Sequence, residues 1–292
     1  MNSRNEDRPG YKKTKVGWIP EEWDADLLEN HSKRGSGHTP NKKEPSYYDG
    51  SIVWISLADS AALDNGIITE SSVTISEDGI RHSSAVLHPR GTVLLSRDAG
   101  VGKSAIAGCD LCVSQHFIAW VCNETTLHNW FLYWHLQQRK REFERIAVES
   151  TIKTIGLPYF KRYPIPLPSL PEQEAIAEVL ECWDRAIRVV KLCKHLNEQR
   201  LVDRALVSQL IRAGTSIGAN VEEAQSGQSR ADFLSKISIA CKEARETHYW
   251  LRLIAASEEG INDQMTEIIQ EANEIVSVLT SIVKNTKANA DE

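Results

Sequence analysis

Hydrophobic positions follow two different patterns along this chain of 292 residues. Up to about residue 125, short apolar runs alternate with turn residues, as in SIVWISLAD, GTVLLS and SQHFIAWVC, which is typical of β-strands. Aromatic and aliphatic residues then recur at helical spacing over 127–148, before short segments punctuated by proline return over 150–168. The first part of the chain is therefore predicted to mix α-helix and β-strand.

A long helix is predicted to begin after Ser169. Ser169 and Glu172 have the spacing of a capping box, and Pro171 falls in the first turn, where its missing N–H costs nothing. Apolar residues then recur at alternating spacings of four and three. They form one stripe along the helix, made of Ile176, Leu180, Trp183, Ile187 and Val190. Such a stripe needs a partner helix.

Three more helices are predicted to follow. They cover about 201–224, 230–256 and 262–286, and a second capping box, from Ser229 to Asp232, opens the middle one. Together with the long helix they are enough for a bundle.

These patterns give a fold class and a set of boundaries. An α+β domain is followed by an all-α up-down four-helix bundle, and the long helix is shared by both. The predicted parts are a disordered tail at 1–15, the α+β domain at 16–168, the shared helix at 169–199, the rest of the bundle at 200–287 and a tail at 288–292.

Composition and charge limit the possible functions. The longest apolar runs are shorter than the ~18 to 20 residues of a membrane span, and the first 20 residues contain no stretch typical of a signal peptide. The sequence therefore predicts a cytoplasmic chain with no membrane segment, whose six cysteines are reduced thiols. The net charge is −6, which argues against coating nucleic acid by charge alone, although a small basic face can still bind phosphates.

Four segments of the first 185 residues share their motifs with a known family. They are VGWIPEEWDADLL, GSGHTPNKKEPSYYDGSIVWISLAD, HPRGTVLLSRDAGVGKSAIAG and PLPSLPEQEAIAEVL. In this order they resemble a first strand, a G-x-T-P … Y-x-x-G-x-I-x-W segment, a P-x-G-x-x-L-x-S hairpin and a closing Leu-Pro-Glu-Gln helix. That is the pattern of a target-recognition domain in the specificity subunits of type I restriction-modification enzymes.

Two segments of the second half resemble a different family. They are LVSQLIRAGTSIGANVEEAQ at 206–225 and DFLSKISIACKEARETHYWLRLI at 232–254, with AIRVVKLCKHL as a first helix. They are similar to the small four-helix-bundle proteins first known as products of ribosomal-RNA intervening sequences, whose members form ring-like oligomers. This resemblance covers roughly 186–285 and places the joint between the two parts near Asp184 to Arg188.

The first resemblance implies a DNA-recognition subunit that is not an enzyme. Such subunits bind double-stranded DNA and position a separate adenine methyltransferase subunit and a translocase-nuclease subunit, which carry the cofactor sites, so no cofactor is expected on this chain. One recognition domain reads one half of a split target, and a second one is missing here. We therefore expect a homo-oligomer or pairing with another specificity chain.

Two other hypotheses stay open from the sequence. The bundle could be the active part of an oligomeric scaffold or nucleic-acid-binding accessory protein, with a vestigial recognition domain. An autonomous enzyme ranks last, because no nucleophile, base and orienting group cluster in the sequence.

DNA recognition requires side chains that bind base edges and cations that bind phosphates. Arg97 and Gln115 are the types suited to bidentate base contacts, and replacing Arg97 with Ala is expected to cost roughly 1 to 3 kcal/mol of specific binding. Taken singly, each candidate could equally be a solvated surface residue. The full set is Lys33, Arg34, Lys42, Lys43, Arg97, Lys103, Gln115 and Lys153.

Two motifs are interpreted as structural. AGVGKSAIAG lacks the first glycine of a P-loop, since Arg97 stands at that position, so a tight turn containing Gly100 and Gly102 is predicted instead of an ATP site. By residue type, Cys109, Cys112, His116 and Cys122 resemble a set of zinc ligands. The set has a single C-x-x-C pair within a strand-like run, so buried thiols and no metal are predicted.

The candidate assembly residues lie in the helical half. In EARETHYWLRL, the charges from Glu243 to Arg252 are interpreted as intrahelical and interhelical pairs rather than a catalytic set. Gly214 and Gly218 would each cost about 1 kcal/mol in a helix interior, so close helix packing is their predicted role. The set comprises Ile176, Leu180, Trp183, Ile187, Gly214, Gly218, Arg245 and Trp250.

Overall fold

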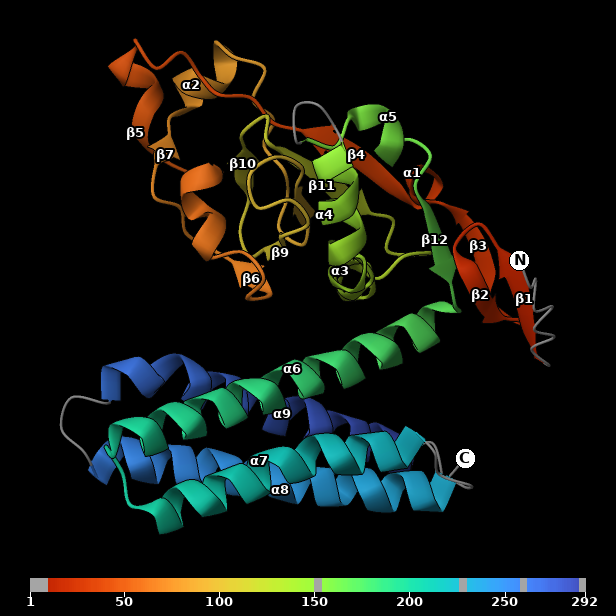
Figure 1. Cartoon of the computed structure of the whole chain (residues 1–292), viewed down its shortest axis with the longest axis vertical. Helices are drawn as coiled ribbons and strands as arrows, with labels where there is room; N and C mark the ends of the chain where they lie inside the picture. Colours follow the sequence, from red (N-terminus) through yellow and green to blue (C-terminus); the bar gives the residue numbers. More distant parts are fainter. Residues whose placement is uncertain (1–9, 150–153, 226–229, 258–261, 289–292) are drawn as a thin grey trace. The chain divides into compact units, whose positions relative to one another are not determined.

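The computed structural model describes residues 10–149, 154–225, 230–257 and 262–288 (Figure 1). The chain divides into two compact units between Ala177 and Glu178, whereas the sequence placed the joint near Asp184 to Arg188. The boundary falls inside one helix, α6 (Leu170–Gln199), whose first turns belong to unit 1 and whose remainder belongs to unit 2.

Unit 1 contains a five-stranded sheet and three smaller ones. The order of the large sheet is β4 (Ser32–Ser36), β11 (Phe117–Cys122), β8 (Val93–Ser96), β9 (Ser104–Ala107) and β6 (Ile67–Ile68). A three-stranded sheet has the order β10 (Leu111–Val113), β5 (Tyr48–Ile55) and β7 (Thr74–Ile75). Two pairs complete the set: β1 (Tyr11–Thr14) with β2 (Gly17–Pro20), and β12 (Pro164–Leu167) with β3 (Asp24–Leu27).

The helices of unit 1 are short. They are α1 (Leu28–His31), α2 (Glu77–Arg81), α3 (Asn129–Gln138), α4 (Lys140–Glu149) and α5 (Leu157–Phe160), with 3-10 turns η1 (Pro45–Tyr47) and η2 (Leu57–Ala61). α3 lies against β8 and β9 (Figure 1). The helical spacing over 127–148 is confirmed by two helices, α3 and α4, which are separated at Arg139. The Arg139 guanidinium donates to the Val16 carbonyl oxygen at 2.8 Å.

Both faces of the large sheet are buried, and alternate residues serve different cores. Val93 and Leu95 pack with aromatic residues of α3 and α4, such as Phe131 and Phe143. Leu94, between them, belongs to a second cluster that includes residues of β5 and β10. The large sheet therefore carries helices on one face and the smaller sheet on the other.

One expectation for this unit is corrected. The tail predicted at 1–15 overlaps β1, which pairs antiparallel with β2 across a turn in which Gly17 has φ +120°. α6 begins at Leu170, directly after Ser169, as predicted, and the Glu172 carboxylate accepts a hydrogen bond from the Trp23 indole N–H at 3.0 Å. The first turn of α6 is thereby tied to the loop between β2 and β3.

The described residues of unit 2 form four helices. After α6 come α7 (Arg204–Gln225), α8 (Arg230–Ser257) and α9 (Asn262–Ala288). All four contribute to a single apolar cluster, represented by Val189, Leu210, Leu251 and Met265. The predicted helix boundaries agree with these to within a few residues, whereas Ser229 of the second predicted capping box lies outside the described residues. None of the described helices is both long and apolar enough to cross a membrane.

Cross-contacts give the bundle its up-down order. Arg212 pairs with Glu246, and Glu223 pairs with Lys236, so α7 and α8 run antiparallel. The pair of Arg212 with Glu246 confirms that a charge of the EARETHYWLRL segment makes an interhelical pair, as predicted. Arg245 donates to the Thr280 hydroxyl of α9 at 3.3 Å, and the Trp250 indole donates to Glu246 at 3.2 Å. Both of these candidate assembly residues therefore make contacts within unit 2.

Most of the apolar stripe of α6 is exposed in the described residues of unit 2. Leu180, Trp183, Ile187 and Val190 are 38 to 47% exposed. The helix instead turns a different set of residues, such as Val189, Cys193 and Leu196, into the shared core. Ile176, at the start of the stripe, packs against the core of unit 1.

The two glycines of α7 differ in their surroundings. A Cβ on Gly214 would lie 2.6 Å from Cγ1 of Val189 on α6, closer than side chains tolerate. A Cβ on Gly218 would meet nothing nearer than the Ala186 Cβ at 3.9 Å. The predicted close packing is therefore confirmed at Gly214 and wrong at Gly218.

This difference predicts opposite stability effects on one helix. Gly218→Ala should raise the free energy of unfolding of the bundle by about 1 kcal/mol, because alanine favours the helix and has room. Gly214→Ala should lower it, since the new methyl group overlaps Val189. Urea denaturation followed by circular dichroism at 222 nm measures both, and equal shifts of the two variants would contradict the packing described.

Candidate functional site

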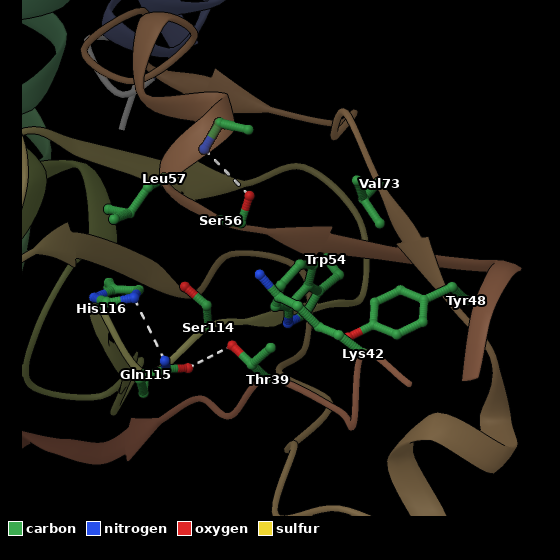
Figure 2. A pocket seen from close by; sticks show the side chains of 11 residues that line it. Thr39, Lys42, Tyr48, Trp54, Ser56, Leu57, Val73, Ser114, Gln115 and His116 are labelled. Carbon is green, nitrogen blue, oxygen red and sulfur yellow. Dashed lines mark hydrogen bonds between the residues drawn. The ribbon is translucent and has the colours of Figure 1, made fainter. Parts of the chain in front are cut away.

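A pocket of about 650 Å³ in unit 1 collects side chains from segments far apart in the sequence (Figure 2). The loop after β4, strand β5, the start of η2, the segment before β7 and the turn between β10 and β11 all contribute. Its walls combine aromatic, hydroxyl, amide and cationic groups, which suits a polar, planar ligand edge. The lining residues are Thr39, Lys42, Tyr48, Trp54, Ser56, Leu57, Ala58, Val73, Ser114, Gln115 and His116.

Gln115 lies between two polar neighbours at the pocket wall (Figure 2). The Thr39 hydroxyl donates to Gln115 Oε1 at 2.5 Å, and Gln115 Nε2 lies 3.4 Å from His116 Nε2. On its other side, His116 Nδ1 bonds the Asp98 carboxylate, which also accepts from the Thr154 hydroxyl. Four segments of the chain are thus connected through side-chain hydrogen bonds.

The loop that carries Thr39 is fixed by close backbone contact. A Cβ on Gly37 would lie 1.7 Å from the Val113 carbonyl oxygen, so only glycine allows the loop to approach β10. The His38 N–H donates to that same oxygen at 3.1 Å. Two residues before Gly37, at the end of β4, a Cβ on Gly35 would lie 2.4 Å from Cε1 of the buried His88 imidazole. Both glycines of the GSGHTP segment are therefore required by packing.

Two aromatic residues hold the same loop from the pocket side. The Trp54 indole N–H donates to the His38 carbonyl oxygen at 3.1 Å, and the Tyr48 hydroxyl donates to the Pro40 carbonyl oxygen at 2.6 Å. Burial raises the pKa of Tyr48 above its ordinary value, so the phenol stays a donor at neutral pH. Thr39 is therefore positioned by a bond on either side of it.

The turn that carries Gln115 is fixed by Arg97. The Arg97 guanidinium donates to the main-chain oxygens of Gln115 and Ile155, both at 3.2 Å. The main-chain N–H of Arg97 donates to the main-chain oxygen of His116 at 3.0 Å. Arg97 opens the β8–β9 hairpin, in which Gly100 and Gly102 have φ of +70° and +84°, as the sequence predicted. The hairpin and the turn are thereby held together.

The structure brings only some of the predicted DNA-binding residues to this site. Lys42 and Gln115 line the pocket, Arg97 supports it, and Lys43 is exposed next to Lys42. Their contacts with DNA stay predictions. The sequence analysis missed Thr39 and Asp98, for which the only signal was their place in motif-bearing loops.

The remaining candidates lie elsewhere or have protein partners. Arg34 pairs with Glu29 at 2.5 Å, and the Lys103 amine donates to the Ser60 carbonyl oxygen at 2.7 Å. Lys33 is exposed on β4, and Lys153 lies outside the described residues. Lys103 thus stabilises the hairpin next to η2.

The cysteines that the sequence offered as possible zinc ligands lie apart from one another. Cys112 packs near Trp54, Cys109 packs near the β5–β10 cluster and Cys122 packs under α3, so the three thiols lie in different clusters. Burial raises the pKa of Cys112 to about 11 and of Cys122 to about 12, which keeps them protonated. No group of three or more potential metal ligands occurs in the part of the chain that the structure describes.

The predicted strand is broken at Ser114–His116, so His116 is a turn residue and not a strand residue.

Residues 20–198 match the family model for the type I restriction modification DNA specificity domain. The chain belongs to this family. Residues 178–281 match a second family model, that of the 23S rRNA-intervening sequence protein. The specificity-domain match covers the whole of the pocket and ends within α6.

Named relatives agree with the specificity-domain match. The chain is 30% identical to the type I restriction enzyme MjaIX specificity subunit of Methanocaldococcus jannaschii, over 61% of this chain and 41% of that protein. It is 25% identical to the Escherichia coli EcoR124I/EcoR124II specificity subunit, over 63% of this chain and 46% of that one. It therefore spans less than half the length of these two relatives.

A solved structure is similar to part of the chain. It is a protein of unknown function from the S23 ribosomal protein family of Bacteroides thetaiotaomicron, 44% identical, covering 37% of this chain and 98% of its own, with a TM-score of 0.35.

The packing at Gly37 predicts a large stability effect in this specificity-domain protein. Gly37→Ala should lower the free energy of unfolding of unit 1 by about 2 kcal/mol or more, because the Val113 backbone must move. Gly156→Ala is the matched control, since Gly156 has φ −67° and its nearest atom at 3.5 Å. Thermal melting followed by near-ultraviolet circular dichroism measures both. A neutral Gly37→Ala would contradict the loop geometry.

Proposed function

We propose that this chain is the DNA-sequence-recognition subunit of a type I-like restriction-modification system, acting in the cytoplasm. Unit 1 reads one half of a split double-stranded target and positions a separate adenine methyltransferase subunit and, in a restriction complex, a translocase-nuclease subunit. The chain itself supplies no catalytic group. The observation that carries this proposal is the match of residues 20–198 to the DNA specificity domain family.

The geometry of the pocket supports this role. An exposed amide at Gln115 stands on a rigid turn, and two exposed lysines, Lys42 and Lys43, follow Thr39 in the neighbouring loop. Amides read base edges, and lysines bind phosphates without sequence preference. Reading and anchoring groups therefore occur on adjacent loops.

Unit 2 supports the proposed role in assembly. A groove of about 370 Å³ between α6 and α7 is lined by the exposed Trp183, Ile187 and Val190 together with Gly218. Lys191 and Glu222 lie on its rim and carry opposite charges, so a two-fold contact can pair each with the other on a second copy. A second copy also supplies the second recognition domain that a split target requires.

Phosphate anchoring by the lysines has a salt signature. The double variant Lys42→Ala and Lys43→Ala should weaken binding to all duplexes about equally and reduce the slope of log K against log[salt] by about 2. Lys242→Ala with Lys284→Ala removes the same charge from exposed positions of unit 2 and should leave the slope unchanged. Fluorescence anisotropy titrations at several salt concentrations measure both slopes. Identical slopes for the two double variants would refute the anchoring role.

The self-association surface is tested by charge insertion. Ile187→Glu should weaken self-association by about 100-fold or more, because a charge left unpaired in an apolar contact costs several kcal/mol. Ile239→Glu makes the same change at an exposed isoleucine on α8, outside the groove, and should have little effect. Sedimentation velocity over a concentration series measures both. Loss of oligomers with Ile239→Glu alone would place the interface elsewhere.

A further inference from the structure

We propose that Gln115 is a specificity-determining residue that reads the N6/N7 edge of one adenine in the target, and that Thr39, His116 and Asp98 are its positioning residues. The inference rests on the proposed function and adds to it a base, a contact and a supporting network.

The network fixes which way the Gln115 amide points. A carboxylate oxygen accepts hydrogen bonds, so the bond between Asp98 and His116 places a proton on Nδ1 of the imidazole. When Nδ1 carries the only ring proton, Nε2 is an acceptor, and it faces Gln115 Nε2. On the other side, the Thr39 hydroxyl donates to Oε1. Amide nitrogen and oxygen are each held by the partner that suits them.

The amide keeps a donor and an acceptor for a ligand. It has two N–H donors and two oxygen lone pairs. His116 takes one donor and Thr39 takes one lone pair, so one donor and one lone pair remain on an exposed side chain. In the major groove only adenine presents an N7 acceptor next to an N6 donor, and a glutamine amide binds both at once. The free pair of Gln115 therefore matches adenine.

The supporting loops are rigid enough for such a contact. Thr39 is held by the bonds that Trp54 and Tyr48 make to its two neighbours, and the turn of Gln115 is held by Arg97. A base-reading group gains selectivity when its rotamer is fixed before binding, because a rigid amide cannot rearrange to suit a different base. Arg97 thus contributes through the turn that it holds.

The test uses the full chain together with its methyltransferase subunit. Selection from randomised duplexes defines the preferred site, and anisotropy then measures affinity for that site with each adenine replaced in turn by 7-deazaadenine, which lacks the N7 acceptor. We expect one replacement to weaken wild-type binding by about 5- to 150-fold, the range of a bidentate base contact. Gln115→Ala should bind more weakly and be insensitive to that same replacement.

Further variants separate reading from positioning. Gln115→Glu, whose carboxylate only accepts, should move the preference at that position towards cytosine. Thr39→Val keeps the shape but removes the donor, and should relax the preference at the same position only. Gln138→Ala changes an exposed glutamine at the end of α3 and should keep the wild-type preference.

The outcomes distinguish this inference from the function on which it rests. A wild-type site in which no adenine is sensitive to 7-deazaadenine overturns the role of Gln115 and leaves the DNA-recognition function intact. An unchanged preference in Gln115→Ala does the same. Absence of any selected sequence for the wild-type complex would overturn both.

Discussion

The contact between the Gly37 backbone and the Val113 carbonyl oxygen sets the geometry of the recognition unit. Because no side chain intervenes, the loop after β4 lies directly on the end of β10, and His38 donates a hydrogen bond to the same oxygen. That approach brings Thr39 to Gln115, which is 76 residues further along the chain. Without it, the amide would lose the donor that fixes its orientation.

The sequence predicted the recognition unit through its motifs and not through its contacts. Glycines at 35 and 37 were part of a recognised pattern, but their reason, the His88 ring and the Val113 oxygen, lies in partners distant in sequence. The positive φ values of Gly100 and Gly102 could be predicted, because a tight turn is a local property. The bonds from Arg97 to the turn of Gln115 could not, since they depend on how two loops meet.

The failures of the sequence analysis have the same origin. Helical spacing was predicted over 127–148, but it did not reveal that the helix is divided at Arg139, whose guanidinium bonds the Val16 oxygen, a tertiary contact. The stripe of α6 was predicted to need a partner helix, and the structure leaves it 38 to 47% exposed from Leu180 to Val190. What covers it stays a prediction, because spacing alone does not identify a partner. Within unit 2 the helix uses another face, with Val189 against Gly214.

The two halves of the chain divide the proposed work. Unit 1 holds a fixed amide and adjacent cations on loops supported by two sheets, which is the arrangement required to read bases. Unit 2 leaves an apolar groove between α6 and α7, which is the arrangement required to join copies. Neither proposed role requires a catalytic group on the chain itself.

In the proposed function, this chain gives a methyltransferase its target sequence. N6-methyladenine can be mapped in the genome of a host that expresses the methyltransferase subunit with and without this chain. We expect methylation at one short defined sequence only when the chain is present. Methylation that is absent, scattered, or the same without the chain would contradict it.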